Sequence, residues 1–372
     1  MRVAVCLEQC LAPVPGGTGR YSAELAAGLA RTAPPEATVI GWTAHHRDVG
    51  PAVLPGVVGP RRLPLPRRPL VAAWERGVGP VPRGADLVHA PTLLVPPRRG
   101  RPLVVTIHDA VPWTHPETLT RRGVAWHRRM GEYAARVADL VVVPTRAVAD
   151  ELAGVLPRLT DRVCVVGHGV SDQLRQPPAD APTRARRLGL PDDGYLLSLA
   201  TLEPRKGLDV LLAALARPAC PDLPLLLVGQ PGWGGVDPMA EAARLGLAPD
   251  RVRVLGRVDD ADLAVLLHRA TVLVAPSRAE GFGLPVLEAM AAGTPVVSSD
   301  APALVEVGGG ASVVVPVGSA EALADALRQV VENTALRAGL ARAGRDRANS
   351  YSWDGAARTL WAAYEKLAAP SA

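Results

Sequence analysis

The chain has 372 residues, of which 48% are hydrophobic and only 3% aromatic, and its formal net charge at pH 7 is +5. This length exceeds one ordinary hydrophobic core and favours two domains built on Val, Leu, Ile and Ala. The mild positive charge suits an anionic partner such as a diphosphate or an acidic membrane surface. The arginines are scattered and not interleaved with aromatic residues, which argues against a nucleic-acid-binding protein.

Cysteine use and hydropathy indicate the compartment. No apolar run reaches the roughly 18 residues that a membrane span needs, and residues 1–7 are too short for a signal peptide. The four cysteines do not have the spacing of a zinc site; they are Cys6, Cys10, Cys164 and Cys220. We therefore expect free thiols in a cytoplasmic protein. Peripheral association of the protein with the inner face of a membrane stays open.

Short apolar runs alternate with Ala-rich stretches through the first half of the chain. A helical pattern at residues 19–30 follows the first run, and the runs are continuous, as is typical of parallel strands covered on both faces. The runs lie at residues 3–7, 38–42, 87–89, 103–107 and 140–143. This order predicts an α/β domain.

Two segments depart from that rhythm. Residues 51–82 are rich in Pro, Gly and Arg, which predicts a mobile surface excursion because such a segment makes a poor helix and a poor central strand. Residues 120–138 predict an amphipathic helix with Trp126, Met130 and Tyr133 on one face. That face is explained either by core packing or by a membrane surface.

The second half repeats the α/β pattern. Residues 175–193 carry several prolines and predict a linker. Strands are then expected at residues 195–199, 223–228, 252–255, 272–275, 295–298 and 312–315. We predict domains at 1–175 and 176–352, with a last helix, 353–372, crossing back to the first domain. Two doubly wound domains that face each other form a cleft, where ligands usually bind.

A glycine-rich loop flanked by Glu280 and Glu288 follows the strand expected at 272–275. Pro285 favours the first position of a helix, which would place Glu288 on its first turn. Three backbone N–H groups at this helix N-terminus suit an anion; they belong to Phe282, Gly283 and Leu284. A carboxylate beside an anion must accept hydrogen bonds, and the hydroxyls of ribose and hexose fit that need.

A basic turn, Glu203-Pro204-Arg205-Lys206-Gly207, follows the strand expected at 195–199. Arg205 offers a bidentate fork and Lys206 a point charge, so together they suit a diphosphate. An ordinary solvated turn is the other interpretation.

Glycines lie between the first strand and its helix, at Gly16, Gly17 and Gly19. They let the backbone approach a ligand closely, but Ser22 breaks the dinucleotide-binding fingerprint. The strand expected at 103–107 leads into His108 and Asp109. We expect Asp109 to orient the loop or the imidazole of His108.

The Glu280-x7-Glu288 block and the Glu-Pro-Arg-Lys turn resemble the signature of the retaining glycosyltransferase family 4 with the GT-B fold. The similarity runs from residue 3 to about residue 367. It implies two Rossmann-like domains facing across a cleft. It also implies that Glu288 binds ribose, that Glu280 binds the donor sugar, and that the loop N–H groups serve the sugar and diphosphate.

The same resemblance implies further roles. His108 would lie close to the transferred sugar and donate a hydrogen bond to the sugar or the acceptor, and the backbone around Val258 would meet the nucleobase. The glycines Gly16 and Gly17 would lie against the donor phosphate. The expected catalytic residues are His108, Glu280, Arg205 and Lys206. The expected acceptor-side residues are Gly19, Tyr21 and Asp109.

We therefore expect retaining transfer of a hexose, with mannose from GDP-mannose as the best guess, to a hydroxyl of a glycan, lipid-linked or small-molecule acceptor. No carboxylate is placed to act as a covalent nucleophile, so we expect the leaving diphosphate to help deprotonate the acceptor. Arg205 and Lys206 would replace a metal, and no cofactor is expected. The alternatives are a sugar-nucleotide epimerase of GT-B fold and an inactive sugar-nucleotide-binding protein.

Overall fold

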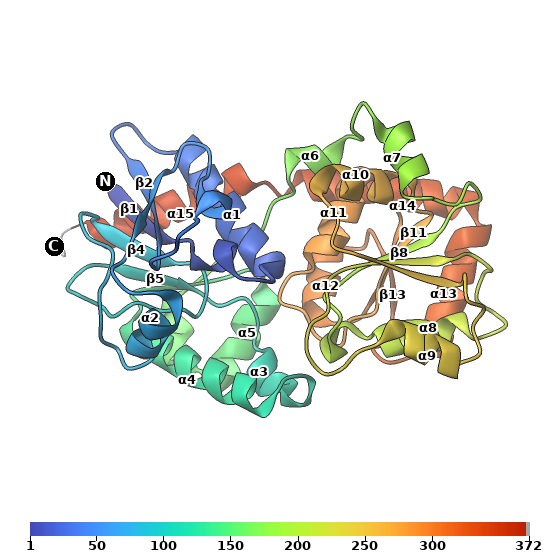
Figure 1. Cartoon of the computed structure of the whole chain (residues 1–372), viewed down its shortest axis with the longest axis horizontal. Helices are drawn as coiled ribbons and strands as arrows, with labels where there is room; N and C mark the ends of the chain where they lie inside the picture. The colour runs from blue at the N-terminus through green and yellow to red at the C-terminus, as the bar shows by residue number, and fades with distance from the viewer. Residues whose placement is uncertain (370–372) are drawn as a thin grey trace. The chain divides into compact units, whose positions relative to one another are not determined.

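The structure is a computed structural model and describes residues 1–369. It contains two compact units, each of which is an α/β domain (Figure 1). The N-terminal unit comprises Met1–Thr114, Arg121–Gly169 and the C-terminal residues from Ser352. The C-terminal unit comprises His115–Thr120 and Val170–Tyr351.

The N-terminal unit is built on a seven-stranded parallel sheet of order β3-β2-β1-β4-β5-β6-β7. Its strands are β1 (Arg2–Cys6), β2 (Thr38–Thr43), β3 (Val58–Arg62), β4 (Leu87–Ala90), β5 (Leu103–Thr106), β6 (Leu140–Val143) and β7 (Val163–Val165). Its helices are α1 (Gly16–Arg31), α2 (Arg67–Trp74), α3 (Val111–Thr114), α4 (Arg121–Val137), α5 (Arg146–Val155) and α15 (Trp353–Ala368), with short 3-10 turns such as η1 (Glu8–Leu11).

The C-terminal unit is built on a six-stranded parallel sheet of order β10-β9-β8-β11-β12-β13. Its strands are β8 (Leu196–Leu199), β9 (Leu225–Val228), β10 (Val252–Gly256), β11 (Val272–Ala275), β12 (Val296–Ser299) and β13 (Val313–Val315). Its helices are α6 (Asp172–Arg175), α7 (Ala181–Arg187), α8 (Leu208–Leu215), α9 (Pro238–Arg244), α10 (Asp260–Arg269), α11 (Leu284–Ala292), α12 (Pro302–Gly308), α13 (Ala320–Glu332) and α14 (Thr334–Asn349).

Both sheets are buried, as the continuous apolar runs predict. Every residue of β4, β5 and β9 is buried, and helices cover the sheets (Figure 1). In the N-terminal unit α2, α4 and α5 place Trp74, Met130 and Leu152 in one core. The predicted fold class, two doubly wound α/β domains, is confirmed.

The prediction of a mobile excursion at residues 51–82 is wrong. The segment contributes β3, which pairs in parallel with β2 at the edge of the sheet, where Pro60 is tolerated. It also contributes α2, whose Leu70 and Trp74 are each 1% exposed. The prolines and arginines hid these elements because they interrupt the apolar pattern.

The prediction of a linker at residues 175–193 is also wrong. The units divide after Gly169, earlier than the boundary predicted at 175, and α6 and α7 both pack on α10. Pro182 lies at the start of α7, where a missing N–H costs nothing, so it begins a helix and does not break one.

The helix predicted at residues 120–138 is α4, and its apolar face packs inward. Met130 is fully buried, and Trp126 and Tyr133 pack partly buried against the same core. The Trp126 indole N–H donates to Glu75 at 2.8 Å. These contacts favour the core-packing interpretation of that face. Within residues 1–369, no helix combines the length and the hydropathy that a membrane crossing requires.

Candidate active site

The turn that carries Arg205 and Lys206 is held against the end of β11. It forms a short 3-10 helix, Pro204–Lys206, and Gly207 follows it in the left-handed conformation with φ of 64°. A Cβ on Gly207 would collide with the backbone carbonyl of Pro276. Only glycine therefore allows this close approach between the two loops.

Glu280 lies at the centre of the polar contacts between these loops. Its carboxylate accepts from Lys206 Nζ at 2.6 Å, from Arg205 Nη1 at 2.9 Å and from Ser277 Oγ at 2.8 Å. Burial alone would raise the pKa of Glu280, but the charges of Lys206 and Arg205 and the hydrogen bonds from Lys206 and Ser277 outweigh it and lower the pKa to about 2. Glu280 is thus ionised at every physiological pH.

Arg205 also pairs with a second carboxylate, that of Glu203, which is not among the predicted site residues. Glu203 is 2% exposed and accepts from Arg205 Nε at 3.0 Å and Nη2 at 2.7 Å. Burial raises the pKa of Glu203, and the cations of Arg205 and Lys206 oppose that shift. Two carboxylates thus balance two cations. The expectation that both cations are available to a diphosphate is incomplete, although Glu203 stands in the same sequence motif.

The Glu280 loop leads into α11, as predicted, but with different bounds. Gly283 has φ of 94° and precedes the helix, Leu284 is its first residue and Pro285 its second. Glu288 is 5% exposed and lies on the second turn, not on the first as predicted. The N–H group of Leu284 has no partner within the helix, as at any helix N-terminus.

These motifs meet at the carboxyl ends of β8 and β11. A small hollow is lined by Lys206, Ser277, Glu280 and Gly283, together with Ser198 at the end of β8. This edge is where doubly wound domains bind ligands. The side chain of Phe282 is 4% exposed and its ring meets Tyr351 edge-on, so it packs inside the unit and leaves only its backbone for a ligand.

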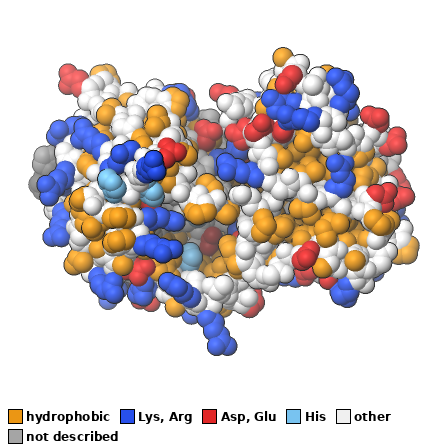
Figure 2. Space-filling view, viewed as in Figure 1, with side chains coloured by type: hydrophobic (Ala, Val, Ile, Leu, Met, Phe, Trp, Pro, Cys, Tyr) orange, Lys and Arg blue, Asp and Glu red, His pale blue; other side chains and the backbone are white. Residues whose placement is uncertain are grey.

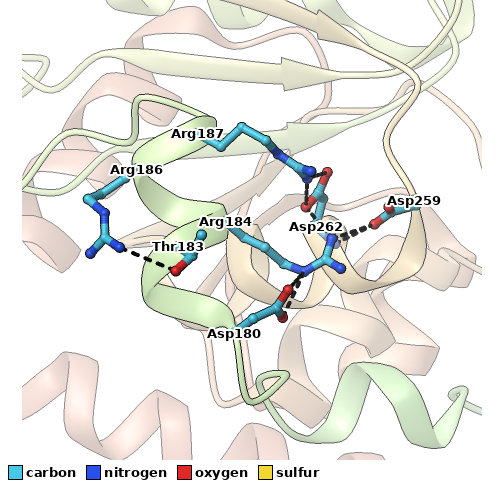
Figure 3. Close-up of polar contacts among 7 residues, drawn as sticks. All are labelled: Asp180, Thr183, Arg184, Arg186, Arg187, Asp259 and Asp262. Atoms are coloured by element: carbon cyan, nitrogen blue, oxygen red, sulfur yellow. Dashed lines mark hydrogen bonds and ion pairs between the residues drawn. The ribbon is translucent and has the colours of Figure 1, made fainter.

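Val258 lies in the loop between β10 and α10 and is half-buried. The loop is braced from α7 by ion pairs (Figure 3). Asp259 caps α10 by accepting from the N–H of Asp262 at 2.7 Å, and Asp262 accepts from Arg184 at 2.8 Å and from Arg187 at 2.6 Å. These contacts anchor the C-terminal end of the predicted nucleobase-binding loop to the start of α10.

In the N-terminal unit the glycine motif is helical. Helix α1 begins at Gly16, not at residue 19, and Gly16 and Gly17 are exposed on its first turn. Gly19 is buried, and a Cβ there would collide with the side chain of Pro15. Tyr21 is 1% exposed. The structure thus places Gly19 and Tyr21 inside the unit, where neither offers a surface to an acceptor.

His108 lies half-buried after β5, and its Nε2 is 2.8 Å from the carbonyl oxygen of Pro91. Burial lowers the pKa of His108, and this is partly offset by the Pro91 carbonyl and by Asp109. The ring is therefore neutral near pH 7. A carbonyl can only accept, so Nε2 carries the proton and Nδ1 is an acceptor. This replaces the expectation that His108 donates to a ligand.

Asp109 acts locally, as expected. Its Oδ1 accepts from the N–H of Val111 at 3.1 Å at the start of α3. The ring of Tyr21 meets the His108 ring edge-on, with centroids 4.7 Å apart. His108, Asp109 and Tyr21 are therefore neighbours in one unit, while Glu280, Arg205 and Lys206 cluster in the other.

Three further features concern the surface cations, the possible metal ligands and the cysteines. Lys and Arg side chains appear at many separate places on the face drawn in Figure 2. Across residues 1–369, no group of three or more His, Cys, Asp and Glu side chains has the arrangement of a metal site. The four cysteines are free thiols, as predicted.

Comparisons with known proteins agree with this architecture. The description "Glycosyltransferase Family 4" matches residues 15–174, and "Glycosyl transferases group 1" matches residues 181–347. O-antigen chain mannosyltransferase B of Escherichia coli is 30% identical over 285 residues, which are 76% of this chain and 74% of that protein. D-inositol 3-phosphate glycosyltransferase of Streptomyces avermitilis is 34% identical over 353 residues, or 85% and 72% of the two chains.

A solved structure of the Anabaena protein HepE in complex with UDP-glucose has a TM-score of 0.76 and 21% identity, covering 98% of this chain and 100% of that one. This likeness concerns the fold. The relatives and the two family matches establish the family itself. The chain therefore belongs to the family 4, group 1 glycosyltransferases and has the two Rossmann-like domains of the GT-B fold.

Proposed function

We propose that this glycosyltransferase is a retaining hexosyltransferase that takes mannose from GDP-mannose and places it on a hydroxyl of a glycan, lipid-linked or small-molecule acceptor. The observation that carries the proposal is the contact of Glu280 with Lys206 and Arg205, at 2.6 and 2.9 Å, beside the N-terminus of α11. The mannosyltransferase name of the E. coli relative supports mannose as the sugar.

The contacts suggest how each group would act. The diphosphate would draw Lys206 and Arg205 toward itself and meet the N-terminal N–H groups of α11. Glu280, ionised and released from its cations, would accept hydrogen bonds from sugar hydroxyls. His108 would accept one more at Nδ1, because its Nε2 proton is committed to Pro91. Glu288 would hold ribose, Val258 would lie at the base, and Gly16 and Gly17 would lie near the phosphates.

The transfer would need neither a metal nor a cofactor, since two cations and a helix N-terminus already oppose the charge of the leaving diphosphate. That diphosphate would take the proton of the attacking hydroxyl. Retention is expected from the family resemblance. Because no carboxylate of the described residues stands out as a nucleophile for a two-step displacement, the hydroxyl would attack on the face from which the diphosphate leaves. We expect the anomeric configuration of the first product, followed by NMR, to match that of the donor, and turnover to survive chelation.

A donor screen tests the identity of the nucleotide sugar. Binding to the folded state raises stability by RT ln(1 + [L]/Kd), or about 2.7 kcal/mol at a hundredfold excess over Kd. GDP-mannose should raise the melting temperature more than GDP-glucose, UDP-glucose or dTDP-glucose. A larger shift with a UDP sugar would replace the proposed donor and keep the fold and family intact.

Lys206→Ala tests the donor site itself. It removes one of the two cations, and we expect turnover to fall by at least a hundredfold, about 2.7 kcal/mol or more in the barrier. Arg244→Ala is the control, because Arg244 is an exposed cation of the same unit that pairs only locally with Glu241. Equal turnover in the two variants would show that the donor site lies elsewhere.

A further inference from the structure

A line of hydrogen-bonded side chains crosses the interior of the N-terminal unit beside His108. Tyr364 Oη lies 2.6 Å from His89 Nδ1, His89 Nε2 lies 2.9 Å from Thr106 Oγ1, and Thr106 Oγ1 lies 3.0 Å from Tyr21 Oη. Each of the four residues is at most 1% exposed. They come from α15, β4, β5 and α1, so the line joins elements from both ends of the chain.

Such a line is costly to bury unless every group finds a partner, and Phe, Leu or Val would fill the same space at little cost. Burial lowers the pKa of His89 to about 3, so its ring stays neutral with one donor and one acceptor nitrogen. The two bonds at the His89 ring are therefore of opposite kinds: one ring nitrogen donates to one hydroxyl, and the other ring nitrogen accepts from the other hydroxyl. A change at Tyr364 is then felt at Thr106 through the tautomer of His89.

The line is coupled to His108 by the chain itself. Thr106 stands two residues before His108, and His89 stands two residues before Pro91, whose carbonyl accepts from His108. Two hydrogen bonds therefore join the ends of β4 and β5. One lies between His89 and Thr106, and the other between His108 and the carbonyl of Pro91. The ring of Tyr21 adds a third constraint, since it meets the His108 ring edge-on at 4.7 Å.

We infer that Tyr364, on the C-terminal helix, is a positioning residue for His108. Its hydroxyl fixes the orientation of His89, which holds Thr106 and Tyr21 and so keeps the His108 ring with its Nε2 proton on Pro91 and its Nδ1 presented to the ligand. The inference rests on the proposed contact of His108 with the donor sugar. Helix α15, which lies far from His108 in the sequence, would thereby affect the contact of His108 with the sugar.

Tyr364→Phe removes only the hydroxyl. We expect kcat to fall at least fivefold because the ring of His108 becomes misoriented. KM for the donor should change less than twofold, because the C-terminal unit with Arg205, Lys206 and Glu280 is unchanged. In the wild type, ¹⁵N NMR of labelled histidine should show His108 as the single Nε2-protonated tautomer. In the variant, the His108 signals should broaden or shift toward a mixture of tautomers.

Tyr195→Phe is the matched control. Tyr195 is also fully buried and its hydroxyl donates to the carbonyl of Leu266 at 2.7 Å, but it lies in the C-terminal unit. Tyr195→Phe loses a buried hydrogen bond as Tyr364→Phe does, and it should keep the wild-type kcat and the wild-type His108 tautomer.

A second pair of variants keeps the inference testable if Tyr364→Phe does not fold. Thr106→Val removes the hydroxyl between His89 and Tyr21 at constant shape and should lower kcat and disturb the tautomer in the same way. Thr106→Ser restores a hydroxyl and should restore both. Wild-type kcat and tautomer in Thr106→Val would overturn the inference.

His108→Ala separates this inference from the proposed function. If His108→Ala lowers kcat by an order of magnitude and Tyr364→Phe leaves kcat and tautomer unchanged, the positioning role is wrong and the function stands. If His108→Ala leaves kcat unchanged, the proposed sugar contact of His108 is wrong. The inference falls with it.

Discussion

Glu280 is bound by three side chains, and the charges of this group sum to zero when Glu203 is included. On the proposed function, a nucleoside diphosphate would enter a site whose two cations already pair with carboxylates. At close range and partial burial a carboxylate opposes a phosphate strongly. Glu280 would thus act against the bare diphosphate and in favour of a sugar that offers hydroxyl donors. On the proposed function, Glu280 would favour binding of the intact donor over binding of the nucleoside diphosphate left after transfer.

Glu280→Gln should consequently change binding and turnover in opposite directions. The amide removes one negative charge and keeps the shape, so the affinity for the nucleoside diphosphate should rise severalfold. The charge-assisted hydrogen bonds to the sugar are weakened, so turnover should fall by at least tenfold. Calorimetric titration and initial rates measure the two effects. Weaker diphosphate binding in Glu280→Gln would mean that the carboxylate chiefly holds the cations in place.

The lowered pKa of Glu280 predicts an acid-dependent part of the stability. The pKa falls from 4.5 to about 2 in the folded state, which corresponds to roughly 3 kcal/mol at neutral pH. Because the folded pKa is the lower one, this stability is complete above pH 4.5 and is lost as the pH falls toward 2. The stability difference between wild type and Glu280→Gln should therefore shrink over that window in denaturant unfolding.

Glu321→Gln is the control for the acid prediction. Glu321 lies in the same unit and meets Arg217 at 3.3 Å, but its side chain is 74% exposed. Its substitution should leave the pH dependence of unfolding close to that of the wild type. A difference for Glu280→Gln that stays constant from pH 6 to pH 2 would contradict the lowered pKa.

The loop elements that carry the site depend on close backbone packing. The turn at Gly207 lies against Pro276, and the N–H of Arg278 donates to the carbonyl of Arg205 at 2.8 Å. The guanidinium of Arg278 bonds the carbonyl of Pro204 at 3.0 Å. These contacts join the loop after β8 to the loop after β11, and so bring Arg205 to Glu280.

Gly207→Ala should break this arrangement. The new Cβ meets a backbone carbonyl and the left-handed φ of 64° disfavours any side chain, so the turn must move. We expect a loss of about 1–3 kcal/mol in stability and a fall of at least tenfold in donor affinity. Gly246→Ala is the control, since its φ of 71° gives similar strain with open space around it. Equal losses of donor affinity in both variants would contradict the role of the Gly207 turn.

The elements show which parts of the fold the sequence could predict. β6 and β11 were predicted with their observed bounds because a run of four apolar residues stands between polar or turn-forming neighbours. β3 was not predicted because it is an edge strand with one apolar residue, Val58, and a proline, Pro60. β7, which has three residues, was missed, although β13, which is equally short, was predicted at 312–315.

The site was predictable to a similar degree. The motifs predicted roles for Arg205, Lys206 and Glu280, whose residue types suit a diphosphate and a sugar, and the structure brings these three side chains together. The pairing of Arg205 with Glu203, and the tautomer of His108, depend on which backbone lies within 3 Å, which is a tertiary property. His89 and Tyr364 had no local signal at all, since a His in a strand and a Tyr in a helix look like ordinary core residues.

At the scale of the whole molecule, the N-terminal unit is completed by the last helix of the chain. Helix α15 packs on α1, where Gly28 lets the backbone of Trp353 approach closely. The Trp361 indole bonds the carbonyl of Leu29, and Arg31 pairs with Asp354 at 2.6 Å. The first unit therefore cannot be finished until nearly the whole chain has been synthesised.

Truncation before Ser352 should consequently unfold the N-terminal unit. It removes four large side chains that are at most 3% exposed; they are Trp353, Leu360, Trp361 and Tyr364. Burying each contributes about 1.5–3 kcal/mol, so their sum rivals the 5–15 kcal/mol that holds a typical domain together. We expect aggregation on gel filtration and a loss of ellipticity beyond that of the missing helix. Asp354→Asn, which removes only an exposed ion pair, should cost less than about 1 kcal/mol. A monodisperse truncated chain with the remaining ellipticity intact would show that α15 is dispensable for folding and would confine its importance to the line from Tyr364 to His108.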